Sequence, residues 1–236
     1  SAPAASGFNA AATGVVNPSD VTGGTLKMGA ISDCDSYDPA RTYYAYCWDI
    51  QRLFTRSLMG FAPLPGAAGT AVVPDLATAA GEANAEKTEW KYTLKDGVKW
   101  EDGSAITSKD VKYAIQRLFA TDVINGGPSS YFTSLLDDGT YKGPYADPDG
   151  DLPSVTTPDD KTIIFKLNKP FADFNFLMAL PTGAPVPASK DPKADYGKKP
   201  FSSGPYKIDS FEAGKSTTWS RNTNWDKATD EIRKAL

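Results

Sequence analysis

The sequence contains no histidine, and this absence removes several classes of chemistry at once. The chain therefore has no Ser-His-Asp or Cys-His nucleophile, no histidine general base and no histidine metal ligand. Two cysteines are too few for a structural zinc site on their own. No apolar run is long enough to cross a bilayer. Basic residues number 25 against 29 acidic ones, and this balance argues against a nucleic-acid partner.

What is present describes a folded chain of 236 residues, 40% of them hydrophobic and 11% aromatic. Residues 1–22 are small and almost uncharged, so we expect a flexible tail or tether there. No signal-peptide pattern is visible, and we expect that any such peptide has been removed. The folded sequence is predicted to begin near residue 23.

Strands and helices are predicted without a strict alternation, so the fold class is α/β in the broad, mixed α+β sense. The clearest helix follows an N-cap at Thr107, with Asp110 in its first turn and apolar residues at helical spacing up to Phe119. Alternation predicts a strand over 89–95, and a hairpin over 205–211 and 216–222. Further predictions are strands over 25–31 and 162–167, helices of about four turns over 43–58 and of shorter length over 171–180, and a final helical turn after 226.

Cys34 and Cys47 enclose twelve residues. If the chain is exported, as its acidic composition and small-residue tail suggest, these thiols are expected to form a disulfide. Two separate free thiols are the alternative.

Acidic clusters were weighed for chemistry and interpreted as turns. The run DPDGD at 147–151 does not have the spacing of an EF-hand calcium loop, and we expect no metal site there. The pairs Asp137-Asp138 and Asp159-Asp160 lie beside Gly or Pro, which favours solvated turns over a glycosidase pair. By contrast, the aromatic run around Tyr43, Tyr44, Tyr46 and Trp48 is too crowded for one buried face, so part of it is expected to line a surface or cleft.

Four stretches together resemble the extracytoplasmic solute-binding proteins of peptide ABC transporters, bacterial family 5. They are GGTL at 23–26 with DSYDP at 35–39; PDLA at 74–77 with WKYTLKDGVKWEDG at 90–103 and TSKDV at 107–111; SGPYK at 203–207; and RNTNW at 221–225. The resemblance covers about residues 23–225, nearly all of the predicted folded chain. The two cysteines are not part of the family pattern.

The resemblance implies a bilobed periplasmic-binding-protein-like fold of type II, of which we expect this chain to hold the first lobe with an inserted subdomain. Residues 23–55 and 200–236 are expected to form an incomplete lobe core, and residues 56–199 the subdomain. The second lobe is expected to be missing, because family members are about twice this length or more.

The function implied is that of a binding protein, not an enzyme, without a cofactor or metal. It is expected to bind oligopeptides, to deliver them to the membrane subunits of an ABC permease, and to be monomeric. Its expected location is extracytoplasmic in a bacterium, periplasmic or as a cell-surface lipoprotein, with the membrane reached only through a removed or unseen lipid anchor. Alternatives are the same fold binding a nickel chelate, haem, an oligosaccharide or an opine, a secreted carbohydrate-active protein, or an interaction module without a solute.

By the same resemblance, the cleft wall is expected to carry Asp33, Cys34 and Asp35, with Ser203 and Gly204 beside them. Tyr131 in the subdomain is a further candidate, placed to stack on a ligand side chain. For Asp33 and Asp35 the alternative is capping of the next helix, and for Gly204 backbone geometry alone.

Overall fold

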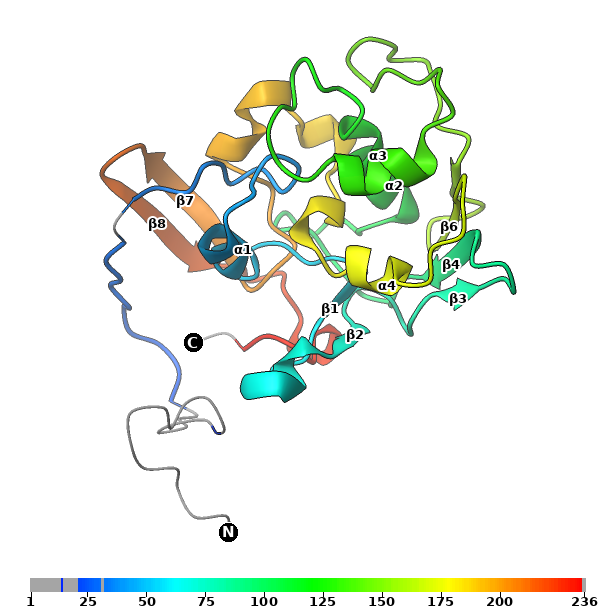
Figure 1. The fold of residues 1–236 in the computed structure, drawn as a ribbon. Helices are drawn as coiled ribbons and strands as arrows, with labels where there is room; N and C mark the ends of the chain where they lie inside the picture. The colour runs from blue at the N-terminus through cyan, green and yellow to red at the C-terminus, as the bar shows by residue number, and fades with distance from the viewer. Residues whose placement is uncertain (1–13, 15–20, 31, 235–236) are drawn as a thin grey trace.

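A capped helix is the clearest of the predicted elements in the computed structural model, which describes residue 14 and residues 21–30 and 32–234 (Figure 1). Helix α2 spans Ser108–Arg117 and begins directly after Thr107, as predicted. The Asp110 carboxylate accepts a hydrogen bond from the Thr107 amide at 2.8 Å, which completes a capping box. Val111 and Ile115 on its inner face are fully buried.

Helix α2 faces a four-stranded antiparallel sheet with the order β3-β4-β6-β5. These strands span Glu82–Ala83 (β3), Glu89–Thr93 (β4), Thr162–Lys166 (β6) and Val155–Thr156 (β5). The register sets Trp90 opposite Phe165 and Tyr92 opposite Ile163, so that alternate residues share the buried face. Helix α4 (Phe174–Leu177) adds Phe174, whose ring centroid lies 5.1 Å from that of Phe165. The alternation predicted over 89–95 and 162–167 is thus confirmed in its strand core.

A separate, smaller core lies under the predicted hairpin, which the structure confirms as β7 (Tyr206–Glu212) and β8 (Ser216–Arg221). Tyr37, Phe54 and Ile208 form this core, and the Trp219 ring packs against it. Helix α1 (Ala45–Gln51) lies beside the hairpin, apart from the sheet (Figure 1). Residues 34–54 and 208–219 therefore share one core, whereas the main core is drawn almost wholly from residues 58–180.

The remaining elements lie outside the four-stranded sheet and the hairpin. Strands β1 (Met59–Phe61) and β2 (Val72–Pro74) form a two-stranded antiparallel sheet, and helix α3 spans Ser130–Leu136. Short 3₁₀ helices span Gly66–Thr70, Pro181–Gly183, Ala188–Lys190, Lys193–Lys198 and Lys227–Thr229. No helix among the described residues has the length and apolar character needed to cross a membrane.

Four predicted elements differ from the structure. Residues 25–30 are not a strand: they are exposed, pair with no described strand and stand apart from the folded body (Figure 1), while residue 31 lies outside the described residues. The helix predicted over 43–58 is confined to α1, and that over 171–180 to α4. The predicted final turn is one 3₁₀ turn, Lys227–Thr229. The predicted tail, residues 1–22, lies almost wholly outside the described residues.

Helix α1 is shorter than predicted because a segment far away in the sequence binds the backbone that follows it. The carbonyl of Phe54 accepts hydrogen bonds from the amides of Ser203 and Gly204 at 2.9 and 3.0 Å, and that of Leu53 accepts one from Tyr206. These carbonyls are therefore used by a distant segment and not by a fourth helical turn. Phe54 and Leu58 still reach buried positions, but from a turn and an extended segment.

Candidate functional site

An open groove of about 470 Å³ lies between the loop that precedes α1 and the connection from α2 to α3. Its volume falls within the range typical of small-ligand sites. Eight residues line it: Asp35, Ser36, Arg41, Tyr43, Tyr44, Asn125, Gly126 and Gly127.

The Asp35 side chain organises the first wall of this groove. Its carboxylate accepts hydrogen bonds from the Thr42 hydroxyl at 2.7 Å, the Tyr43 amide at 2.8 Å and the Ser36 amide at 3.0 Å. It therefore ties both ends of the loop together, next to the residue that begins α1. This resembles the capping alternative considered from the sequence, although the N-cap residue itself is Tyr44.

The disulfide between Cys34 and Cys47 is present and confirms the pairing expected for an exported chain. Their Cα atoms are 5.5 Å apart, and Cys47 is fully buried in α1. The neighbouring Asp33 is held through its carbonyl, which accepts a hydrogen bond from the Tyr46 hydroxyl at 2.9 Å. Cys34 packs on the smaller core, so Asp35 alone of these three predicted residues lines the groove.

Three tyrosines of the crowded aromatic run remain exposed around this wall, as predicted, and Tyr131 of α3 is exposed beside them. Tyr43, Tyr44, Tyr46 and Tyr131 are 56%, 53%, 42% and 44% exposed. Tyr44 and Tyr46 stack with their ring centroids 5.6 Å apart. The Tyr131 hydroxyl, from α3, lies near that of Tyr43, and their interaction raises the pKa of Tyr131. The structure thus brings the predicted Tyr131 to the rim that Asp35 organises.

The opposite wall of the groove was not predicted from the sequence. Arg41 crosses to it and donates to the Asn125 carbonyl at 3.2 Å and to the Asn125 side-chain oxygen at 3.1 Å. Gly127 packs so closely that a Cβ there would lie 2.4 Å from the Ala40 carbonyl oxygen. The dipeptide Gly126-Gly127 indicates a turn in the sequence, but it does not indicate the segment against which that turn packs.

A buried ion pair between α2 and the loop that precedes α1 holds that loop in place. Arg117 of α2 donates from its two terminal nitrogens to Asp38 at 3.0 and 2.7 Å, and from Nε to Asp191 at 3.0 Å. All three side chains are fully buried. Because Asp38 also accepts from the Ala40 amide, this contact sets the position of Arg41 relative to α2.

Ser203 and Gly204 lie away from the groove, in the packing between the two cores. Ser203 is 2% exposed, and its hydroxyl accepts a hydrogen bond from the Arg56 amide at 2.9 Å. A Cβ on Gly204 would lie 2.7 Å from the Leu53 carbonyl oxygen and 2.9 Å from the Phe54 Cα. Both positions therefore have a packing role in this structure, and a ligand contact there stays a prediction.

The paired carboxylates considered for glycosidase chemistry all lie on exposed turns. Asp138 and Asp159 accept hydrogen bonds from nearby amides, which lower the pKa of each, whereas a general acid needs a raised one. No cluster of three or more metal-ligating side chains, DPDGD included, is found among the described residues.

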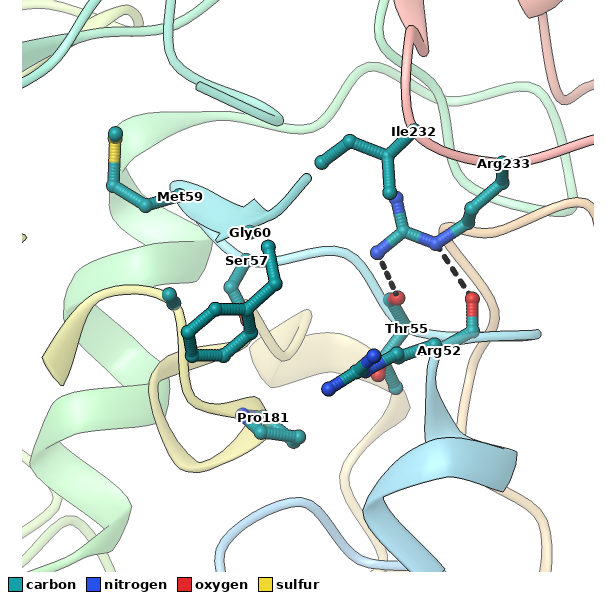
Figure 2. Close-up of a pocket in the computed structure, with 10 residues that line it drawn as sticks. Arg52, Thr55, Ser57, Met59, Gly60, Pro181, Ile232 and Arg233 are labelled. Carbon is teal, nitrogen blue, oxygen red and sulfur yellow. Dashed lines mark hydrogen bonds between the residues drawn. The ribbon is translucent and has the colours of Figure 1, made fainter. Parts of the chain in front are cut away.

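A second hollow is too small for a solute. It measures about 30 Å³, room for about one water molecule, and lies between β1, Pro181 and the C-terminal segment (Figure 2). Arg233 closes one side, donating to the carbonyls of Arg52 and Thr55.

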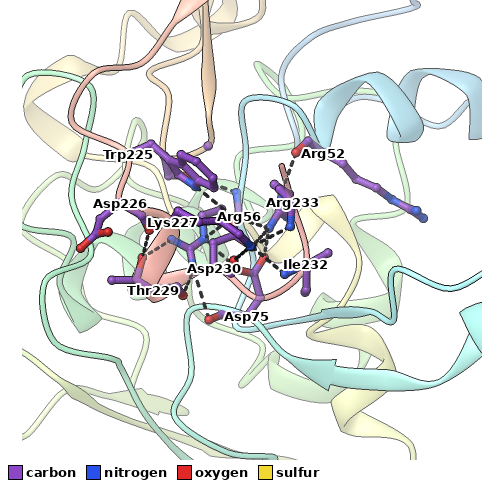
Figure 3. A network of polar contacts seen from close by, with 12 residues as sticks. Arg52, Arg56, Asp75, Trp225, Asp226, Lys227, Thr229, Asp230, Ile232 and Arg233 are labelled. Carbon is purple, nitrogen blue, oxygen red and sulfur yellow. Dashed lines mark hydrogen bonds and ion pairs between the residues drawn. The ribbon is translucent and has the colours of Figure 1, made fainter. Parts of the chain in front are cut away.

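The C-terminal segment is held by a buried network of two arginines and two aspartates (Figure 3). Arg56 lies 2.8 Å from Asp75 and 3.6 Å from Asp230, and Arg233 lies 2.7 Å from Asp75 and 3.2 Å from Asp230. Burial alone would raise the pKa of Asp230, but Arg233 and Arg56 lower it to about 2. The network is charge-balanced, and none of its four residues lines the groove.

Comparison with known proteins identifies the family of the chain. Residues 71–234 match the family model described as bacterial extracellular solute-binding proteins, family 5 middle. The chain is 26% identical over 196 residues to the "Probable D,D-dipeptide-binding periplasmic protein DdpA" of Escherichia coli, covering 80% of this chain and 34% of that protein. It is 29% identical over 163 residues to the "Oligopeptide-binding protein OppA" of Bacillus subtilis, covering 65% of this chain and 29% of that protein.

Among solved structures, "Clavulanic acid biosynthesis oligopeptide binding protein 2" superposes with a TM-score of 0.93 at 48% identity, covering 98% of this chain and 42% of that one. The chain thus spans about a third of the length of the curated relatives it matches. The match confirms the family and the mixed α/β fold expected from the sequence, and the relatives named are binding proteins and not enzymes. The chain belongs to the bacterial extracellular solute-binding proteins of family 5.

Proposed function

We propose that this chain forms one wall of a peptide-binding site in the solute-binding component of an ABC importer. One observation carries the proposal: the groove between Asp35 and Gly126 is the larger of the two hollows described above, and it occurs in a chain of family 5. Relatives across the comparisons are named for oligopeptides or dipeptides, which favours a peptide over the other solutes considered.

The composition of the groove suits a peptide of variable sequence. Tyrosine rings bind side chains through their faces and hydrogen-bond through their hydroxyls, without demanding one partner. The backbone groups of the exposed Gly126 and the half-buried Gly127 add sites for main-chain hydrogen bonds. The predicted contacts of Asp33, Cys34, Asp35 and Tyr131 with the ligand belong to this proposal, with Asp33 and Cys34 acting through the backbone of the loop.

The division into a lobe core and an inserted subdomain is also proposed. The smaller core joins residues 34–54 to residues 208–219, and the main core is drawn almost wholly from residues 58–180. This separation supports the boundaries near 55 and 200. The groove lies where the two parts meet, since Asp35 comes from one and Asn125 from the other.

Delivery to a permease, an extracytoplasmic location, attachment through a lipid anchor and a monomeric state complete the proposal at the level of the whole protein. Family membership supports the first two. The disulfide supports an oxidising compartment.

Isothermal titration calorimetry of the natural protein that carries these residues tests the proposal. Tetra-alanine is the peptide probe, and maltotriose and a nickel–imidazole chelate represent the competing solutes. We expect saturable heat with the peptide alone. Saturable heat with maltotriose or the chelate, and none with the peptide, would replace the proposed solute.

A further inference from the structure

We propose that Arg41, together with the amides of Gly126 and Gly127, forms a carboxylate-binding niche in the groove, which takes a free carboxylate of the bound peptide. This inference rests on the proposed function, because it names the group of the peptide that the groove recognises.

The Arg41 guanidinium forms no ion pair with any residue that the structure describes. Its hydrogen bonds go to neutral acceptors, the carbonyl and side-chain oxygens of Asn125 and, at 3.5 Å, the carbonyl of Ala194. Among the described residues no carboxylate lies within ion-pair distance of it, unlike the buried Arg56, Arg117 and Arg233. Arg41 is only partly exposed and lines the groove. It is therefore a positive charge without a direct ion-pair partner among the described residues, in a groove that Asp35 also lines.

Two backbone amides lie beside this charge. Gly126 and Gly127 have φ values of +78° and +68°, a backbone conformation that favours glycine at both positions. No hydrogen bond from either amide is found within the described part of the chain. Gly127 packs against the backbone of Ala40 and Arg41, so the amides and the guanidinium share one wall. Backbone amides without an internal partner are donors that a bound anion can accept from.

The chemistry fits a carboxylate better than a phosphate. One guanidinium and two amides balance a single negative charge, and the guanidinium fork matches the two oxygens of a carboxylate. Asp35 lines the same groove and its negative charge disfavours a dianion such as phosphate. The Asp35 oxygens already accept three hydrogen bonds, so they do not compete for Arg41.

The test pairs two ligands with four proteins. The ligands are tetra-alanine with a free C-terminal carboxylate and its C-terminal amide, and the readout is the dissociation constant by calorimetry. The proteins are the natural protein, Arg41→Gln, Arg41→Lys and the control Arg221→Gln, which alters an exposed arginine on β8 outside the groove. We expect the natural protein and Arg221→Gln to bind the acid at least about tenfold more tightly than the amide, as a charge-assisted hydrogen bond provides.

Arg41→Gln is expected to abolish this preference, and Arg41→Lys to keep only part of it. Arg41 also holds Asn125, and a merely structural role would weaken both ligands equally, so the acid-to-amide ratio is the decisive quantity. An unchanged ratio in Arg41→Gln, or equal binding of both ligands by the natural protein, would overturn the niche and leave peptide binding intact. If neither ligand binds, the proposed function fails and the niche fails with it. Sodium acetate is expected to bind far more weakly than the peptide, and equal affinity would show a site for free anions.

Discussion

Replacing Asp230 by asparagine removes one of the two negative charges that lie between Arg56 and Arg233. In the folded chain Asp230 is fully buried and accepts hydrogen bonds from the Trp225 indole at 2.9 Å and from the amides of Ile232 and Arg233 at 3.0 Å. Asparagine can keep some of these bonds through its carbonyl oxygen. It cannot neutralise the two guanidinium groups, which are left sharing Asp75.

The magnitude follows from the charge balance. The pKa of Asp230 is lowered from 3.8 to about 2, and each unit corresponds to about 1.4 kcal/mol, so ionisation contributes about 2 kcal/mol to folding. An arginine left partly uncompensated in the interior adds to the loss. We therefore expect Asp230→Asn to lower the free energy of unfolding by about 2–4 kcal/mol at neutral pH.

The loss should also depend on pH. A carboxyl with a lowered pKa stabilises the fold above its unfolded value of 3.8, and this contribution disappears as the pH falls towards about 2. The difference between the natural protein and Asp230→Asn should therefore be full at pH 7 and shrink between about pH 4 and pH 2.

Urea unfolding followed by tryptophan fluorescence measures this difference, with Glu231→Gln as the control, since Glu231 is an exposed neighbour. A variant Asp230→Asn as stable as Glu231→Gln at pH 7 would refute the reasoning. So would a difference that stays constant through acidification.

Three other substitutions have expected outcomes. The double change Cys34→Ser and Cys47→Ser removes the disulfide that closes the loop between two residues 13 positions apart in sequence. It should lower the free energy of unfolding, measured in urea titrations, by about 3 kcal/mol. The prediction is contradicted if reducing the disulfide of the natural protein leaves its stability unchanged. Gly204→Ala places a Cβ within 3.0 Å of the backbone of Leu53 and Phe54, and should cost about 1–3 kcal/mol, whereas an unchanged melting temperature would contradict the close packing. Tyr131→Ala should weaken tetra-alanine binding by roughly 1 kcal/mol, with the folding stability nearly unchanged and Tyr131→Phe close to the natural protein; equal binding by all three would exclude Tyr131 from the site.

Local sequence patterns predicted the elements that depend on local chemistry. The capping box of Thr107 and Asp110, followed by apolar residues at helical spacing, predicted α2 because the signal and its partner lie three residues apart. The hairpin of β7 and β8 was predicted for the same reason, since Gly214 allows the turn between its strands.

Elements that depend on distant partners were predicted poorly. Residues 25–30 carry a strand pattern, but a strand needs a neighbour, and no described strand pairs with them. The apolar spacing over 43–58 is that of a helix, yet Ser203 and Gly204 take the carbonyl of Phe54 and end it early. A short window of sequence shows neither whether a strand finds a neighbour nor which distant residues bind the end of a helix.

The groove shows the same limit. Asp35 and Tyr131 were candidates because a family resemblance placed them, and the structure brings them to one rim. Arg41 and Asn125 were missed, since they are 84 residues apart in sequence and meet only through the fixed position of Asp38 on Arg117. Ser203 and Gly204 were expected at the cleft; the structure shows a packing role for both, and their contact with a ligand stays a prediction.

The central claim is that the groove between Asp35 and Gly126 holds the peptide, and photo-crosslinking tests it most directly. A tetrapeptide that carries benzoyl-phenylalanine at its second position is bound to the natural protein, irradiated and mapped by mass spectrometry after proteolysis. The account predicts crosslinks within residues 35–46 and 125–131, suppressed by excess tetra-alanine. Crosslinks that are equally suppressed but lie only around Ser57, Pro181 and Ile232, at the smaller hollow, would contradict it.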